Sequence, residues 1–338
     1  MNHPVIRVQP LQFPWQTQDP FLFCAYHLDD YPPGDPNLGP GAAATRGRAI
    51  GQDFAPHRAW RMYHGAQVPG FPYHPHRGFE TVTIVKQGVV DHTDSLGGAG
   101  RFMNGDVQWM TAGKGIQHSE MFPLLAQDRG NPLELFQIWL NLPQSSKMVE
   151  PHYKMLWRED IPTVERRDAA GRGTFIDLVA GRFAERTAPA PTPDSWAADP
   201  AHAVSIFTVR MEPEAEWTLP ATATGATRSA YFYRGDRVSI GGQSVAENYV
   251  TTLRADAEIA FRNGAVEGYL LILEGQPISE PVAQHGPFVM NTEQEIREAF
   301  AEYRRTEFGG WPWPEREQVH GRDRGRFARY ADGSEERK

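Results

Sequence analysis

Apolar and polar residues alternate along much of the chain in short runs that turn residues separate. The run over residues 80–85 alternates and is rich in β-branched residues. The pair Asn104-Gly105, which favours a tight hairpin, separates two further runs, and residues 133–142 alternate again. Strands that recur at intervals of about ten residues are typical of a small sandwich or barrel. We therefore expect an all-β first domain over residues 1–143.

The second half of the chain repeats this pattern. Strand-like runs such as SAYFYRG and GYLLILEG recur there, and they predict a second β-barrel over residues 174–290. The stretch 144–173 is charged and mixed in character, so we expect it to be a linker between the barrels. Residues 185–200 are rich in proline and alanine, which favours a loop insertion within the second barrel.

A helix signal follows the second barrel. Thr292 and Glu295 match a capping box, and apolar residues recur after them at helical spacing. From Glu315 onward the chain is charged and poor in apolar residues, which predicts a solvated tail. Residues 291–338 are thus expected to form a C-terminal helix and a charged tail.

The composition narrows the class of protein. The chain has 338 residues, of which 40% are hydrophobic and 22% charged, as in an ordinary globular protein with room for two domains. A net charge of −8 argues against capture of nucleic-acid phosphates. Cys24 is the single cysteine, so no internal disulfide can form and a reducing compartment fits. Since the first residues lack a signal-peptide pattern and no run reaches the ~18 apolar residues of a membrane span, we expect a cytoplasmic protein without membrane binding.

Histidine and glutamate occur in pairs spaced two residues apart. His74 and His76 leave the same face of an extended segment, and His118 and Glu120 do so on a later strand. One such pair alone is more often a hydrogen-bonding feature of a turn, but two pairs within one β-unit favour a metal site. Three imidazoles and a carboxylate suit Fe(II), Mn, Ni, Cu or Zn. Glu80 has the same strand parity as His74 and His76, so alternation alone leaves open which glutamate completes the set.

Three neighbours of these residues permit more than one interpretation. Arg77 could pair with a substrate anion, or it could form a structural ion pair. Gln117 and Lys114 lie near a strand end from which they could reach a ligand. The pattern of residues does not decide between these roles.

Three stretches of the chain resemble the pirin family of the cupin superfamily. They are GFPYHPHRGFETVTIV, GDVQWMTAGKGIQHSEM and EPVAQHGPFVMNTEQEIREAF. The resemblance implies two cupin barrels packed face to face, with one mononuclear metal, usually iron, in the N-terminal barrel only. It places the metal ligands on His74, His76, His118 and Glu120. The second-half runs that repeat the pattern lack the matching histidines, which agrees with a single metal site.

The resemblance also implies an activity. Similar proteins open flavonols such as quercetin with O2, so we expect a mononuclear quercetin 2,3-dioxygenase that uses Fe(II), with Mn, Ni, Co, Cu or Zn as alternatives. Glu120 would bind the metal. Glu80 would act either behind the metal ligands or near the substrate, where it would orient a ligand or accept a proton. The expected partners of this monomer are a small aromatic or flavonol substrate and O2.

Two other functions remain open at this point. Some pirins act on protein partners through the oxidation state of their iron, so a non-enzymatic redox-sensing regulator is the main alternative. A metal-bearing protein that binds a small molecule without turning it over is the third.

Overall fold

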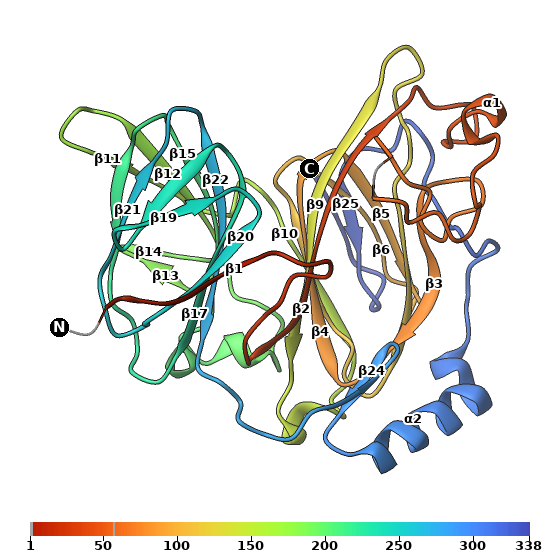
Figure 1. The fold of residues 1–338 in the computed structure, drawn as a ribbon. Helices are drawn as coiled ribbons and strands as arrows, with labels where there is room; N and C mark the ends of the chain where they lie inside the picture. The colour runs from red at the N-terminus through yellow and green to blue at the C-terminus, as the bar shows by residue number, and fades with distance from the viewer. Residues whose placement is uncertain (1–2, 57) are drawn as a thin grey trace. The chain divides into compact units, whose positions relative to one another are not determined.

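The chain is built almost entirely from β-strands. The structure, a computed structural model, describes residues 3–56 and 58–338, and its long helix is α2 (Glu293–Thr306) (Figure 1). The chain forms two compact units. One comprises the residues up to Cys24, Trp139–Asn141 and Glu159–Ser279, and the other comprises Ala25–Ile138, Leu142–Arg158 and Glu280–Lys338. The expectation of two all-β barrels and a helix near the C-terminus is confirmed.

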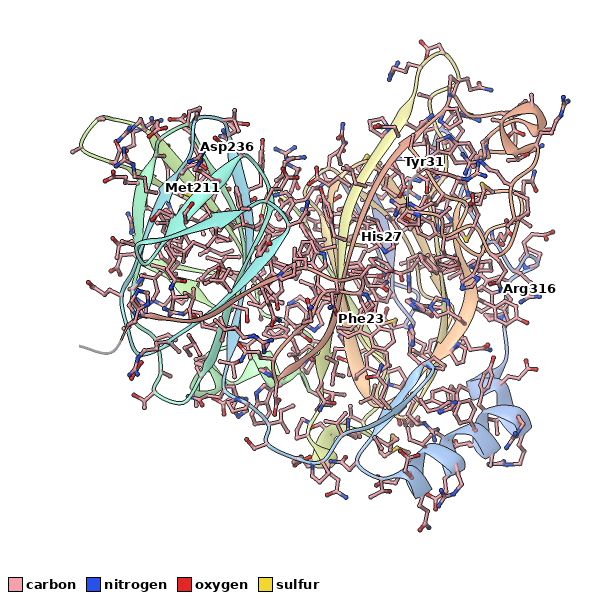
Figure 2. All side chains as sticks on the ribbon, in the orientation of Figure 1. Phe23, His27, Tyr31, Met211, Asp236 and Arg316 are labelled. Carbon is pink, nitrogen blue, oxygen red and sulfur yellow. The ribbon has the colours of Figure 1, made fainter. Side chains whose placement is uncertain are left out.

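The second of these units, which we call the N-terminal barrel, is built on two sheets. The strand order in its first sheet is β10 (His152–Leu156), β7 (Val107–Thr111), β4 (Phe79–Gln87), β9 (Asn131–Asn141) and β2 (Phe21–Tyr31). The order in the other sheet is β26 (Glu335–Arg337), β25 (Phe327–Arg329), β6 (Ala99–Met103), β5 (Val89–Asp94), β8 (Ile116–Met121) and β3 (Gly70–His76). Side chains fill this unit, and the labelled Phe23, His27 and Tyr31 mark the course of β2 (Figure 2).

The C-terminal barrel repeats this strand order. Its large sheet runs β1 (Val5–Pro10), β20 (Tyr249–Leu253), β17 (Thr227–Arg234), β22 (Gly268–Gly275), β15 (Ser205–Met211), β12 (Gly173–Ala180) and β11 (Thr163–Arg167). Its small sheet runs β16 (Glu216–Leu219), β21 (Ile259–Asn263), β18 (Arg237–Ile240) and β19 (Gln243–Ala246). The order β16-β21-β18-β19 therefore matches β3-β8-β5-β6 of the N-terminal barrel.

Three strands pair at sheet edges that their place in the sequence does not suggest. β1 pairs with β20, so the first residues of the chain complete the C-terminal barrel. The stretch 144–173, expected as a linker, contains β10 and β11, which extend β7 and β12 respectively. Each strand thereby covers a sheet edge whose backbone groups would otherwise be unpaired.

The expectation of a solvated tail is wrong. β25 pairs with β6, and its residues Phe327 and Ala328 are buried. Arg326 binds the buried carboxylate of Asp106 with two nitrogens. The tail has few apolar residues, but those few fill the open edge of the N-terminal barrel, and this cannot be seen from its average composition.

The helix signal is confirmed. The Thr292 hydroxyl accepts a hydrogen bond from the Glu295 amide, and the Glu295 carboxylate accepts one from the Thr292 amide, as in a capping box. One face of α2 packs in a small apolar cluster with β24 (Phe288–Met290). Of the helices in the described part of the chain, none combines the length and the apolar character that crossing a bilayer requires.

Candidate metal centre

Three histidines meet on two neighbouring strands of the N-terminal barrel. His74 on β3 lies opposite His118 on β8 in the strand register, and their Nε2 atoms are 3.1 Å apart. His76 follows two residues after His74, on the same side of β3. One ring nitrogen from each of the three histidines lies within 4.8 Å of the other two. The spacing of two residues has therefore brought the imidazoles to one point, as alternation along a strand requires.

A tight bend ends β3 directly after the second histidine. Gly78 has φ +84, and a Cβ atom at this position would lie 1.9 Å from the carbonyl oxygen of Val289. A side chain would therefore force the bend away from β24, so glycine is required here. The bend carries the chain from β3 in one sheet to β4 in the other.

Backbone carbonyls orient two of the imidazoles. His74 Nδ1 lies 2.9 Å from the carbonyl oxygen of Pro72, and His76 Nδ1 lies 3.3 Å from that of Pro287. A carbonyl can only accept, so each Nδ1 carries the proton and each Nε2 presents its lone pair. An outer partner that fixes the tautomer in this way is common for histidines that bind metals.

The electrostatic setting keeps the imidazoles neutral. Burial lowers the pKa of His74 to about 4, and it lowers the pKa of His76 and His118 well below the usual range. All three rings are then unprotonated near neutral pH. Neutral imidazole is the form that binds a metal ion, so the donor set fits a borderline divalent metal.

Glu120 lies beside the three histidines. Its Oε2 is 3.7 Å from His118 Nε2. Thr83 donates its hydroxyl hydrogen bond to Oε1 over 2.9 Å, and the Gln137 amide donates to Oε2 over 2.5 Å. Burial raises the pKa of the Glu120 carboxyl. The two donors hold this buried carboxyl next to the cluster.

Glu80 is not part of this group. It lies three residues before Thr83 on the regular part of β4, so its side chain leaves the opposite face of the strand. Its Oε1 accepts hydrogen bonds from the indole of Trp109 over 3.1 Å and the hydroxyl of Thr111 over 2.7 Å. The structure therefore gives no support to the expectation that Glu80 lies near the substrate.

The sequence left open the roles of Arg77, Gln117 and Lys114, and each of these side chains contacts another part of the chain. The Arg77 guanidinium forms an ion pair with Glu302 of α2 over 2.8 Å, which is the structural alternative. Gln117 donates to two carbonyls that follow α2, and the Lys114 ammonium lies 2.5 Å from the Glu150 carboxylate. None of the three reaches the site.

Sequence reasoning missed three residues at the site. Thr83 and Gln137 hold Glu120, and His92 lies opposite Glu120 on β5, with its ring centroid 5.7 Å from that of His118. Alternation along β4 could have indicated that Thr83 and Glu80 lie on opposite faces of the strand. Gln137 and His92 come from other strands, so only the pairing of the strands reveals them.

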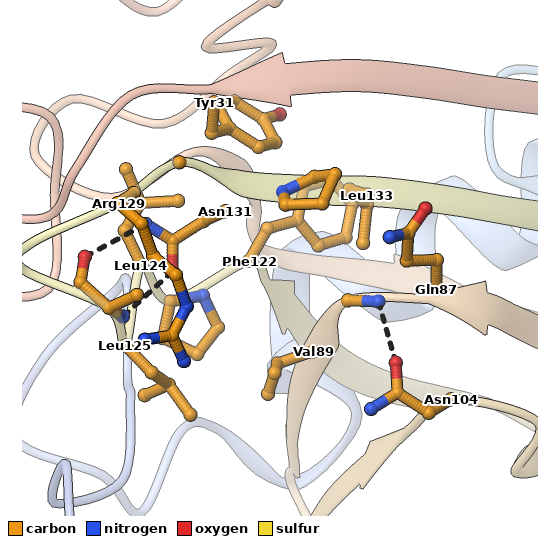
Figure 3. Close-up of a pocket in the computed structure, with 15 residues that line it drawn as sticks. Tyr31, Gln87, Val89, Asn104, Phe122, Leu124, Leu125, Arg129, Asn131 and Leu133 are labelled. Carbon is orange, nitrogen blue, oxygen red and sulfur yellow. Dashed lines mark hydrogen bonds between the residues drawn. The ribbon is translucent and has the colours of Figure 1, made fainter.

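A separate pocket lies in the same barrel. Its wall includes Tyr31, Phe122 and Leu133, with Asn104 and Asn131 at the polar side (Figure 3). Both asparagine side chains are engaged in hydrogen bonds with the backbone. None of the three histidines lines this pocket.

Comparison with known proteins gives consistent results. The family model described as Pirin matches residues 16–140, and the model described as Pirin C-terminal cupin domain matches residues 206–309. A Pseudomonas aeruginosa protein named "Putative quercetin 2,3-dioxygenase" is 38% identical over 242 residues, which cover 72% of this chain and 80% of that protein. Human pirin is 33% identical, over 80% of this chain and 89% of its own length.

Among solved structures, a quercetin 2,3-dioxygenase from Acinetobacter baumannii is similar over nearly the whole chain. The TM-score is 0.71 at 28% sequence identity, and the match covers 91% of this chain and 98% of the other.

Proposed function

Because this chain belongs to the pirin family, we propose that it holds one divalent metal ion in its N-terminal barrel and opens flavonols such as quercetin with O2. One observation carries the proposal. One ring nitrogen from each of three imidazoles lies within 4.8 Å of the others, and a buried carboxyl lies beside them. The similarity to proteins named as quercetin 2,3-dioxygenases supports the flavonol.

His74, His76, His118 and Glu120 would hold the ion. A divalent metal bound there supplies Lewis acidity toward a substrate hydroxyl, together with the coordination positions that four protein ligands leave open. Fe(II) is the proposed metal, with Mn, Ni, Co, Cu and Zn as alternatives that suit the same donors.

Two neighbouring side chains fix the orientation of the Glu120 carboxylate. Thr83 and Gln137 bind both of its oxygens, so the carboxylate stays in one orientation beside His118. The carboxylate lies beside His118, where the ion and a bound flavonol would meet, which suits a group that accepts the proton of the flavonol hydroxyl. We assign the role of proton acceptor to Glu120 rather than to Glu80, because Glu80 faces the other side of β4.

Aromatic side chains adjoin the most exposed of the histidines. His74 is half-buried, whereas His76 and His118 are buried. The ring of Phe71 lies 6.3 Å from that of His74, and Tyr63 stacks on Phe71 at 5.2 Å. A planar aromatic substrate that approaches His74 would meet these rings, which favours an aromatic ligand.

The test is oxygen uptake by protein of known metal content. The protein is purified without added metal, analysed for bound ions, and loaded separately with Fe, Mn, Ni, Co and Cu. We expect quercetin-dependent oxygen consumption in the iron form and none in a His76→Ala variant treated in the same way. Uptake that never exceeds this variant in any metal form would overturn the flavonol reaction, and the family's regulatory role would then be preferred.

A further inference from the structure

Each of the three histidines has a neighbour in the chain that contacts one C-terminal segment. These neighbours are Tyr73, Arg77 and Gln117, and the segment is residues 302–317, which we call the strap. In Figure 1 the chain after α2 runs alongside β3, and Figure 2 labels Arg316 on this path. Because side chains alternate along a strand, Tyr73 and Gln117 face the strap while His74 and His118 face the site.

Gln117 has the most complete contacts with the strap. Its amide nitrogen donates to the carbonyl oxygens of Glu307 over 2.8 Å and Gly310 over 3.0 Å. Its amide oxygen accepts from the Tyr303 hydroxyl over 2.9 Å. Gln117 is fully buried, so these bonds are shielded from water. The residue directly before His118 is therefore fixed to the strap at both ends of its amide group.

Tyr73 and Arg77 fix β3 to the same segment. The Tyr73 ring stacks on Trp311 at 5.0 Å, and its backbone amide donates to the Arg316 carbonyl over 3.0 Å. The buried Arg77 guanidinium pairs with Glu302 over 2.8 Å and lies 4.4 Å above the ring of Phe308. The two residues that flank the His74–His76 pair in the sequence, Tyr73 and Arg77, thus both contact the strap.

The strap is anchored at its far end. The Glu317 carboxylate accepts hydrogen bonds from three successive backbone amides, those of Ala66, Gln67 and Val68, over 2.6, 2.9 and 3.1 Å. These amides lie directly before β3. The indole of Trp313 donates to the Asp94 carbonyl at the end of β5 over 2.8 Å. The strap therefore connects the three strands β3, β8 and β5 on the side away from the site.

We propose that the strap sets the distance between β3 and β8, and thereby the spacing of the three histidine nitrogens. Tyr303, Glu302 and Glu317 are then positioning residues, which act on the metal through the histidines' neighbours. The inference rests on the proposed metal site. A ligand set held within a few tenths of an ångström binds more tightly than a loose one, so docking of the strap raises metal affinity. By linkage, metal binding must stabilise the docked strap by the same factor.

The test compares two tyrosine variants in the N-terminal barrel. Tyr303→Phe removes the hydrogen bond to Gln117 and leaves the ring in place. Tyr31→Phe is the matched control. It also removes one hydroxyl hydrogen bond, which Tyr31 donates to the Arg61 carbonyl over 2.8 Å. Neither residue adjoins one of the three histidines in the sequence. Metal affinity is measured by competition with a chelator. We expect Tyr303→Phe to weaken it by about three- to tenfold, in line with the loss of one buried hydrogen bond, and Tyr31→Phe to leave it unchanged.

Two further readouts separate positioning from general stability. The Co(II) absorption spectrum, which reports ligand geometry, is expected to shift in Tyr303→Phe and not in the control. Metal loading of the wild type is expected to slow amide exchange across residues 302–317. Equal affinities and spectra in the two variants, or exchange in the strap that metal leaves unchanged, would overturn the inference while the metal site stands. Wild-type protein that binds no metal would instead overturn the proposed function on which it rests.

Discussion

The two barrels place different residues at the same point of one strand order. In the N-terminal barrel, β3 and β8 bring His74 opposite His118. In the C-terminal barrel the matching strands, β16 and β21, bring Trp217 opposite Phe261, and these rings stack at 5.0 Å. Leu219 and Ile259 follow in the same apolar core. The comparison shows that these interior positions can carry paired histidines or can close the core with apolar side chains.

The difference also has an energetic side. Aromatic and aliphatic side chains in the C-terminal barrel contribute roughly 25 cal/mol per Å² of apolar surface that they bury. Buried imidazoles contribute less, and their depressed pKa values show that the interior disfavours their charged form. We therefore expect the C-terminal barrel to serve stability and the N-terminal barrel to serve binding.

The sharpest way to break this comparison is to remove a ligand. His118→Ala is expected to lower metal affinity by well over the roughly 10–100-fold that loss of an outer partner costs, because an inner ligand is lost. Elemental analysis should find one metal ion per wild-type chain and a near-empty variant. Two ions per wild-type chain would show that the C-terminal barrel also binds metal.

The matching substitution in the C-terminal barrel is Trp217→Ala. It removes a buried ring and leaves a cavity, so we expect the free energy of unfolding to fall by about 3–5 kcal/mol. Urea denaturation measures this loss, and metal content at saturation should stay as in the wild type. A variant that lost its metal while folded would contradict the separation of roles.

A comparison of the two glutamates sharpens the picture within the N-terminal barrel. Glu120→Gln replaces a charged ligand oxygen by a neutral one that can still coordinate, so metal affinity is expected to fall by less than in His118→Ala but by at least the roughly 10–100-fold that loss of an outer partner costs. Glu80→Gln should retain the metal, since its carboxylate binds Trp109 and Thr111 on the other face of β4. If Glu80→Gln stripped the metal and Glu120→Gln retained it, the assignment would be wrong.

The smallest expected effect concerns pH. Lys147 donates to the Gly78 carbonyl behind the bend after His76, and burial lowers its pKa from 10.5 to about 8. Between pH 8 and 10.5 the unfolded chain binds this proton more tightly than the folded one, so stability rises with pH in that window. We expect a gain of about 1–3 kcal/mol at pH 10 relative to pH 7.5. Lys147→Met should lack this rise, and an identical rise in the variant would assign it to another group.

Much of the site followed from local alternation. The spacing of His74 and His76, and of His118 and Glu120, was enough to predict that each pair shares a face. Glu80 shows where such counting fails. Parity from His76 to Glu80 crosses the bend at Gly78, where β3 ends, and β4 belongs to the other sheet, so the two strands do not share one alternation.

The class of the fold could be predicted from the sequence, but the pairing of the strands at the edges of its sheets could not. Strand runs and the capping box at Thr292 are local signals, and the structure bears both out. The pairing of β1 with β20 and of β25 with β6 joins residues far apart in the sequence, and such edge strands carry little local signature. The strap contacts of Gln117 belong to the same class, because nothing near Gln117 in the sequence indicates Tyr303.

The pairing of β1 with β20 has a consequence for biosynthesis. About 250 residues separate Val5 from its partner Leu253. At roughly 5–20 residues per second, the first strand leaves the ribosome some 10–50 s before its partner exists. During that interval the nascent chain carries an unpaired strand to which chaperones or other chains can bind. Although β1 is made before every other strand of the described chain, it can pair only after β20 has been synthesised.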